Sequence, residues 1–282
     1  NVWVIVIIAG GLMTASAYYG IKAIEIVSFI SVPLIAILGT YSMVSATADG
    51  GGLSAIFAKS TGMGVVSAVG LVVGSFVSGG SATPNFTRFA KSTSSAVITT
   101  VVAFFLGNTL MFSFGAVGGA FTGKDDIFYV MIAQGLAIPA IVVLGANIWT
   151  TNNNALYTTG LGYANITKIP KKPLVLVAGI LGTLAALWLY DNFVGWLNIL
   201  NATLPPVGTV LIVDYFARRR SYSAGIVAFK WVPVLSILAG ALVGWFVKDL
   251  GIPAINAMVT TVVVYLGGMA LEHALGLEFT VG

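Results

Sequence analysis

Apolar stretches recur along the whole of this 282-residue chain, and short polar segments separate them. Many of the stretches reach the length of about 20 residues that a helix needs to cross the hydrocarbon core of a bilayer. Charged residues make up only 8% of the chain, whereas a soluble domain carries about 25%. The sequence therefore predicts an all-α polytopic membrane protein, with a single transmembrane domain over residues 1–282 and no separate soluble domain.

The hydropathy pattern predicts nine spans, at 2–20, 23–46, 64–89, 95–118, 127–163, 174–190, 193–215, 230–248 and 252–271. When the loops are taken alternately, one set holds ten basic residues: Lys22, Arg88, Lys91, Lys168, Lys171, Lys172, Arg218, Arg219, Arg220 and Lys230. The other set holds only three, Lys59, Lys124 and Lys248. Because cytoplasmic loops are enriched in Lys and Arg, this asymmetry predicts an external Asn1 and a cytoplasmic C-terminus. Topology, and not nucleic acid as a partner, then accounts for the net charge of +4.

The chain lacks the residues that several kinds of chemistry require. The chain has no cysteine, which excludes disulfides, iron–sulfur clusters and thiol catalysis. We see no cluster of histidine and carboxylate side chains that could run a reaction, so we do not expect an enzyme. None of the nine Asp and Glu residues lies at the middle of a predicted span, where a proton-coupled carrier usually has a titratable group. A sodium gradient is the better candidate for a driving force.

The third predicted span contains several residues that disturb helices. Gly70, Gly74, Gly79 and Gly80 lie within it, and Pro84 follows. Glycine lowers helix stability, and proline lacks the N–H of a helical hydrogen bond. The pattern predicts a helix that is interrupted between residues 74 and 84, with backbone groups free to bind a ligand. The alternative is a proline kink with glycines that only pack helices together.

The fifth predicted span contains the uncharged polar tract Thr150-Thr151-Asn152-Asn153-Asn154, which must face protein or a cavity at that depth. At about 100° per residue, Asn147 shares one helix face with Thr150 and Thr151. Their oxygens could coordinate Na⁺, while Asn152 projects about 140° from Asn147 and could bind a solute. The alternative is that the threonine hydroxyls bond to carbonyls of their own helix. The whole tract favours a site for a small neutral polar solute, a monovalent cation, or both.

Five segments carry a resemblance to a known family: LVVGSF at 71–76, VAFFLGN at 102–108, MIAQGL at 131–136, NIWTTN at 147–152 and WLYDNFVGWL at 188–197. They resemble the bacterial cytosine carriers of the nucleobase–cation symporter family, and the similarity extends over nearly the whole chain. The resemblance implies the LeuT-type inverted-repeat transporter fold of twelve helices, with the nine spans matching helices four to twelve. We therefore expect helices one to three to be absent from this sequence.

The resemblance also implies a substrate site. The third span is similar to the family's discontinuous sixth helix, in which Ser75, Phe76 and Ser78 would line the site. Phe76 would stack on the flat face of the base, and Asn152 in the counterpart of the eighth helix would hydrogen-bond its edge. An amide offers both a donor and an acceptor, which suits a pyrimidine with an exocyclic amine beside an acceptor nitrogen.

The same resemblance implies half of a sodium site in the counterpart of the eighth helix. Asn147 would contribute its main-chain carbonyl, and Thr150 and Thr151 would contribute their hydroxyls. The expected function is sodium-coupled symport of cytosine by alternating access, performed by a monomer in the bacterial inner (cytoplasmic) membrane. The lipid bilayer and a small-molecule substrate are the expected partners.

Other functions stay open at this point. The same fold could carry another nucleobase, a hydantoin or a vitamin, and residues outside this sequence could couple transport to protons. A channel and an integral membrane enzyme are the remaining classes. Saturable uptake would distinguish a carrier from a channel, and turnover of the substrate would be needed to support an enzyme.

Overall fold

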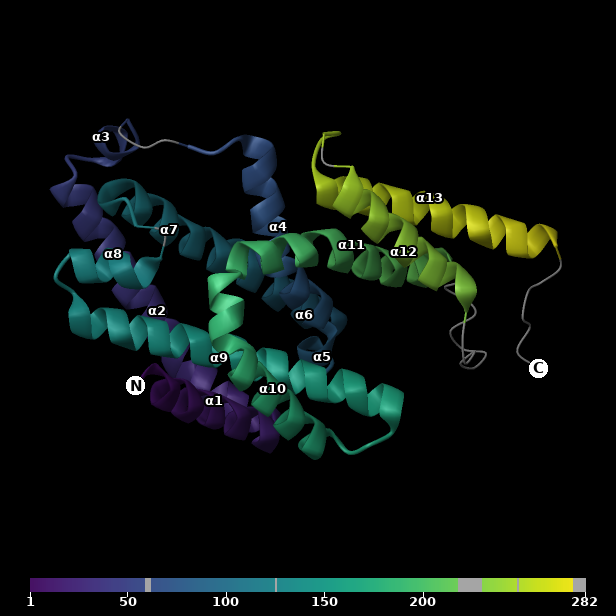
Figure 1. Cartoon of the computed structure of the whole chain (residues 1–282), viewed down its shortest axis with the longest axis horizontal. Coiled ribbons are helices and arrows are strands. Elements are labelled where there is room, and N and C mark those ends of the chain that lie inside the picture. The colour runs from purple at the N-terminus through teal and green to yellow at the C-terminus, as the bar shows by residue number, and fades with distance from the viewer. Residues whose placement is uncertain (59–61, 125, 218–229, 248, 276–282) are drawn as a thin grey trace. The chain divides into compact units, whose positions relative to one another are not determined.

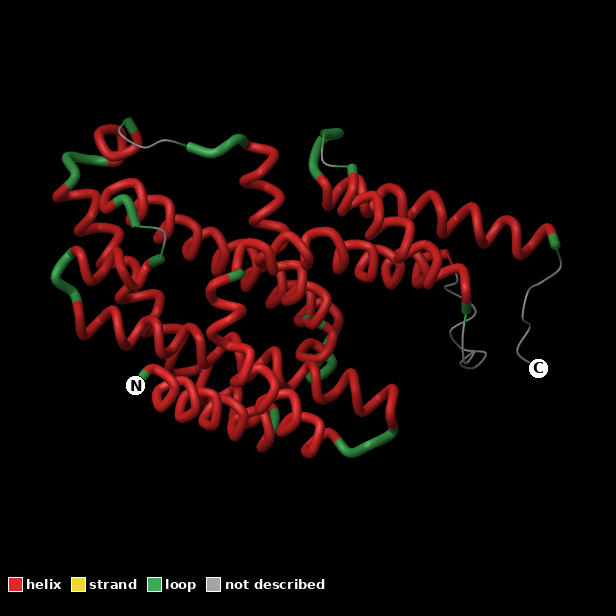
Figure 2. Tube along the Cα trace, viewed as in Figure 1, coloured by secondary structure: helices red, strands yellow, loops and turns green. Residues whose placement is uncertain are grey.

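The computed structural model describes residues 1–58, 62–124, 126–217, 230–247 and 249–275. Every regular element within these ranges is helical, as predicted (Figures 1 and 2). In chain order the elements are α1 (Val2–Tyr19), α2 (Ile21–Asp49), α3 (Leu53–Phe57), α4 (Val65–Ala82), α5 (Pro84–Thr87), α6 (Thr93–Val102), the π-helical turn η1 (Ala103–Gly107), α7 (Asn108–Thr122), α8 (Ile127–Ala133), α9 (Ala137–Thr167), α10 (Lys171–Asp191), α11 (Phe193–Ala217), α12 (Trp231–Phe246) and α13 (Pro253–Ala274).

Seven helical stretches among the described residues are long and apolar enough to cross a membrane. They are Val2–Tyr19, Ile21–Asp49, Val65–Thr87, Thr93–Thr122, Lys171–Asp191, Phe193–Ala217 and Pro253–Ala274. α12 is apolar but has only 16 residues. α9 has 31 residues, and it is not among the seven because its polar residues lower its hydropathy. Several residues used for the charge asymmetry lie outside the described residues: Lys59, Arg218, Arg219, Arg220 and Lys248.

The predicted interruption of the third span is wrong in its position. α4 runs without a break from Val65 to Ala82 and therefore passes through Gly74, Gly79 and Gly80. The regular helix ends only at Thr83, and Pro84 begins the short helix α5. Proline is tolerated at the first position of a helix, where an N–H has no helical acceptor. The cost of glycine, about 1 kcal/mol per residue, is evidently too small to end a helix that packs against its neighbours.

The fifth predicted span is two helices and not one. α8 ends at Ala133, and α9 begins at Ala137 after a turn at Gly135, whose φ is 77°. Leu136 N donates to Met131 O at 2.8 Å, so the turn binds a carbonyl left free at the end of α8. Glycine is the residue that adopts this left-handed conformation without steric cost. The turn sets the start of the long helix that carries the polar tract.

The described chain divides into two compact units, Asn1–Gly62 with Asn85–Leu187, and Met63–Pro84 with Trp188–Gly282. In the first unit, α2 packs against α9, α7 and α1, and α9 also packs against α1 and α8. One of its apolar clusters joins four helices through the buried residues Ala17, Ile24, Tyr157 and Val175. This cluster holds the C-terminal half of α9 against α1, α2 and α10.

The second unit is built on α11, which packs against α4, α12 and α13. α12 and α13 approach closely at Gly240, where a Cβ atom would lie 2.0 Å from Thr261 Oγ1. The fully buried Tyr265 of α13 donates its hydroxyl to Asp214 of α11. Small residues and one buried polar contact thus bring the three helices together, as is common in membrane proteins.

Candidate functional site

The polar tract of α9 is divided among different surroundings. Thr151 and Asn152 are exposed, Thr150 and Asn154 are half-buried, and Asn153 is fully buried. Because successive residues of a helix point about 100° apart, five consecutive polar residues cannot share one environment. The tract therefore consists of separate contacts, and each of them has its own chemistry.

Thr150 follows the alternative that the sequence left open. Its Oγ1 donates to two carbonyls of its own helix, those of Ala146 and Asn147, each at 3.0 Å. The Asn147 main-chain carbonyl, a predicted sodium ligand, is thus already a hydrogen-bond acceptor. Within α9 that carbonyl also faces the helical N–H of Thr151, four residues further on. The Thr150 hydroxyl, by contrast, keeps its own lone pairs for a cation when it donates. The geometry leaves the sodium site at Asn147, Thr150 and Thr151 as a prediction.

Two side chains of the tract region reach α1. Trp149 Nε1 donates to Ser16 Oγ at 3.2 Å, and Asn152 Nδ2 lies 3.5 Å from Met13 Sδ. Thioether sulfur is a weak acceptor, so the second contact leaves the amide of Asn152 available to a better partner. Substrate binding by Asn152 therefore stays a prediction.

Asn153 is the residue that the sequence analysis did not single out. Its side chain is fully buried, and neither amide atom has a hydrogen-bond partner among the described residues. Leaving a buried polar group without a partner costs about 1–3 kcal/mol, and most such groups in proteins are satisfied. Asn153 lies one turn before the buried Tyr157 on the same helix face. No sequence signal separated it from Asn152, because the tract alone does not say which amide faces the interior.

A group of cationic side chains surrounds Tyr157 at the C-terminal half of α9. Arg88 donates to the Tyr157 hydroxyl at 3.1 Å, and the Lys171 Nζ lies 4.5 Å from the centroid of its ring. Lys171 also donates to the main-chain oxygen of Ala17 at 3.3 Å. These contacts tie the start of α10 to α9 and to the end of α1, at the side that the charge asymmetry predicts to be cytoplasmic.

The predicted substrate residues of the third span lie on α4. Ser75 and Phe76 are half-buried, and Ser78 is exposed. Ser75 Oγ donates to Val72 O at 2.9 Å within the helix. Phe76 makes a further contact in the structure and is not free. All three residues belong to regular helix, so the backbone there is engaged and only the side chains could bind a solute.

The glycines of α4 have a packing function. A Cβ atom on Gly74 would lie 2.6 Å from Leu197 O and 3.2 Å from Asn201 Cβ of α11, and one on Gly70 would lie 3.3 Å from Asn201 Nδ2. The Asn201 side chain is buried, and its Oδ1 has no partner among the described residues. This agrees with the alternative reading of Gly70 and Gly74 as helix-packing residues.

The structure places the predicted site residues in both units. Ser75, Phe76 and Ser78 belong to the second unit, while Asn147, Thr150, Thr151 and Asn152 belong to the first. Each unit holds its own set on one helix, and a shared site between the sets stays a prediction. No group of three or more His, Cys, Asp or Glu residues that could hold a metal occurs in the described part of the chain.

Residues 1–230 match the family model described as permeases for cytosine/purines, uracil, thiamine and allantoin. The chain belongs to this family. It is thus a multi-pass membrane protein of a permease family and not an enzyme. The predicted resemblance is confirmed.

Curated relatives and a solved structure support the same assignment. The chain is 48% identical over 268 residues to the cytosine permeases of Escherichia coli K12 and O157:H7, an alignment that covers 93% of this chain. The chain spans 64% of the length of those relatives. It is also similar to a solved structure described as the inward-facing conformation of Mhp1, with a TM-score of 0.65 and 18% identity. That likeness covers 94% of this chain and 65% of the other, and it confirms the predicted fold.

Proposed function

We propose that this chain carries the transport helices of a symporter that brings cytosine into the cell together with Na⁺. The observation that carries the proposal is the 48% identity to cytosine permease over 268 residues. The alignment covers 93% of this chain, so it includes both α4 and α9, on which the predicted site residues lie. Uncharged side chains dominate these helices, which suits a neutral polar base that must leave water without meeting a fixed charge.

On this proposal, α4 and α9 supply different parts of base recognition. Phe76 offers a ring for stacking, which is worth about 1–3 kcal/mol per base where it has been measured in single-strand binding. Ser75 and Ser78 line the site, and Asn152 bonds the edge of the base. Asn153 strengthens this assignment, because its buried amide lacks partners in the described chain and a base edge offers both a donor and an acceptor.

Sodium is proposed to bind at the other face of the α9 tract, at the Asn147 carbonyl and the Thr150 and Thr151 hydroxyls. A cation there would favour one of the two arrangements of the carrier, and the substrate would favour the same one before the site opens to the other side. Thermodynamic coupling is reciprocal, so Na⁺ that tightens cytosine binding must itself be bound more tightly when cytosine is present.

Other substrates of the family should be tested in the same transport assay. The family description covers purines, uracil, thiamine and allantoin as well as cytosine. Purines and uracil are flat polar solutes that stacking and an amide can recognise. Unlabelled purine, uracil, hydantoin and thiamine should therefore each be tested in competition with labelled cytosine.

The direct test is uptake of radiolabelled cytosine into proteoliposomes with and without an inward sodium gradient. We expect saturable uptake that rises with the inward sodium gradient. When a pH gradient replaces the sodium gradient, uptake should stay at the level measured without any gradient. Equal cytosine affinity with and without Na⁺ would contradict sodium coupling, and uptake driven by the pH gradient would support proton coupling. Absence of cytosine binding, combined with binding of another competitor, would reassign the substrate.

A further inference from the structure

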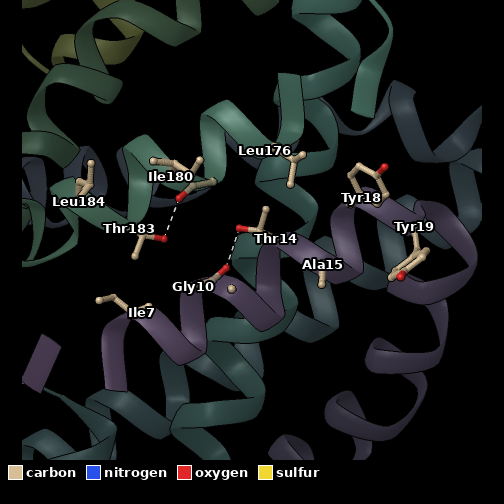
Figure 3. A pocket seen from close by; sticks show the side chains of 12 residues that line it. Ile7, Gly10, Thr14, Ala15, Tyr18, Tyr19, Leu176, Ile180, Thr183 and Leu184 are labelled. Atoms are coloured by element: carbon tan, nitrogen blue, oxygen red, sulfur yellow. Dashed lines mark hydrogen bonds between the residues drawn. The ribbon is translucent and has the colours of Figure 1, made fainter. Parts of the chain in front are cut away.

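A groove of about 500 Å³ runs between α1 and α10 within the first unit (Figure 3). The α1 side is formed by Ile7, Gly10, Gly11, Thr14, Ala15, Tyr18 and Tyr19, and the α10 side by Leu176, Gly179, Ile180, Thr183 and Leu184. The two threonine hydroxyls are turned inward to their own helices, Thr14 to Gly10 O at 2.6 Å and Thr183 to Gly179 O at 2.7 Å (Figure 3). The surface that the groove offers to a ligand is therefore apolar over most of its length.

One end of the groove is cationic. Tyr18 and Tyr19 form this end in Figure 3, and the Lys172 Nζ lies 5.1 Å from the centroid of the Tyr18 ring. Lys172 is exposed, and no carboxylate among the described residues lies within ion-pairing distance of it. The neighbouring Lys171 adds to the same positive potential. The charge asymmetry of the sequence predicts that this end faces the cytoplasm.

The apolar and cationic parts lie along one stripe of α10. Lys172, Leu176, Ile180 and Leu184 recur every four residues, so they follow one another up the same side of the helix. At 1.5 Å per residue the stripe from Lys172 to Leu184 is about 18 Å long. That length is close to half of the ~30 Å hydrocarbon core, which is the depth that the acyl chains of one leaflet occupy.

We propose that this groove binds an anionic phospholipid of the cytoplasmic leaflet, with one acyl chain between α1 and α10 and the phosphate at Lys172. Charge complementarity selects this occupant, because an apolar groove that ends at an exposed ammonium group matches a molecule with an acyl chain and an anionic head. Basic pockets between transmembrane helices on the cytoplasmic side are known to hold such headgroups. On the α1 side, the small residues Gly11 and Ala15 leave the groove open.

The test uses native mass spectrometry of the purified protein with phosphatidylglycerol or phosphatidylcholine of identical acyl chains. We expect the wild-type protein to retain phosphatidylglycerol about fivefold more tightly, the factor expected for one cationic side chain near an anionic lipid. Lys172→Gln should remove this preference and leave the weaker phosphatidylcholine binding unchanged. Lys124→Gln removes the same charge between α7 and α8, and it should keep the wild-type preference.

A second pair of variants tests the apolar part of the groove. A Cβ atom on Gly11 would meet nothing within 4 Å, so Gly11→Leu can fill the groove without disturbing the helices. We expect this variant to lose at least fivefold in binding of both lipids. Gly182 of α10 is equally open and does not line the groove, so Gly182→Leu is the matched control and should bind as wild type. Ala15→Phe serves as a second groove-filling variant if Gly11→Leu does not elute as a folded monodisperse protein.

Three results would overturn the proposal. The first is equal retention of the two lipids by the wild-type protein. The second is full lipid binding by both groove-filling variants. The third is a covalent crosslink, in native membranes, from a photoreactive side chain placed at position 15 to another polypeptide segment. It would show that protein and not lipid fills the groove.

Discussion

Thr14 of α1 lies directly against Gly179 of α10, where a Cβ atom would come within 2.2 Å of the Thr14 Oγ1. The relationship is reciprocal, because a Cβ atom on Gly10 of α1 would lie 2.2 Å from Thr183 Oγ1 of α10. Each threonine hydroxyl bonds to a carbonyl of its own helix, so neither polar group is left for the interface. The two helices therefore touch through two glycine–threonine pairs, a form of the small-residue packing that brings membrane helices close together.

Gly179→Val should destabilise the protein by about 1–3 kcal/mol, because the added side chain must displace Thr14 from a packed contact. The matched control is Gly182→Val on the same helix, where a Cβ atom meets nothing within 4 Å. Thermal unfolding in detergent measures both variants. Equal melting temperatures for the two would show that the contact between α1 and α10 does not limit stability.

Gln134→Leu should lower the unfolding free energy by about 1–3 kcal/mol, because it removes the hydrogen-bond partner of the Ser42 hydroxyl, and Ser42 is buried. Ser42 Oγ donates to Gln134 Oε1 at 2.5 Å, and Gln134 Nε2 donates to Ser42 O at 2.9 Å. Ser45→Ala is the control, since its hydroxyl makes only an exposed contact with Asp49. Chemical denaturation in mild detergent distinguishes the two. A change in Gln134→Leu no larger than that in Ser45→Ala would argue against the pair as a link between α2 and the turn before α9.

Asn153→Leu should keep or raise thermal stability while it lowers cytosine binding. The substitution keeps the number and branching of the side-chain heavy atoms and removes a buried amide that has no partner in the described chain, which relieves a cost of about 1–3 kcal/mol. Asn165→Leu, at an exposed position on the same helix, should bind cytosine as wild type does. Paired melting and binding curves test this. A clear loss of stability with normal binding would mean that the Asn153 amide has a structural partner instead of a ligand.

Phe76→Ala should weaken cytosine binding roughly 5- to 150-fold, the range that corresponds to one stacking contact. The exposed Phe216 of α11 offers a control in the same unit, and Phe216→Ala should leave the affinity unchanged. Equilibrium binding of labelled cytosine at saturating sodium is the measurement. Wild-type affinity in Phe76→Ala would remove α4 from the substrate site.

Thr151→Ala should raise the sodium concentration needed for half-maximal cytosine binding and leave the affinity without sodium unchanged. The reason is that a lost oxygen ligand weakens only the cation, and reciprocal coupling passes this loss to the substrate. Thr167→Ala is a suitable comparison, since its hydroxyl bonds to Tyr163 O at the exposed end of the same helix. An equal loss of cytosine affinity at every sodium concentration would instead place Thr151 in contact with the base.

Much of the helical architecture could be predicted from hydropathy, because a segment that crosses a bilayer must be long, apolar and helical. The observed bounds of α1, α10, α11 and α13 differ from the predicted ones by only a few residues. The interruptions were harder to predict. Gly79 and Gly80 suggested a break and lie inside regular helix, whereas Gly135 makes a left-handed turn that hydropathy did not reveal. The residue type is the same at both positions, and the neighbours of the glycine in space decide whether the backbone bends there.

The candidate site, too, could be predicted only in part from the sequence. The run from Thr150 to Asn154 was visible as a polar interruption of an apolar chain, and its uncharged chemistry pointed to a neutral solute. Which of its amides is buried was not visible, because that depends on the rotation of α9 against α1 and α2. The contacts of Trp149 with Ser16 and of Arg88 with Tyr157 join residues that are 133 and 69 positions apart.

The sequence by itself determined the membrane environment and the helical content of this protein, because both follow from the local order of apolar and polar residues. Its family was indicated by the resemblance of five short segments. Only the tertiary structure decided that Asn153 is buried, that α4 continues past its glycines, and that α1 and α10 enclose a groove ending at Lys172. These features depend on how helix surfaces fit together over long separations in the chain. Steric fit at Gly10, Gly74 and Gly179 is set by atoms on other helices, and no local pattern encodes it.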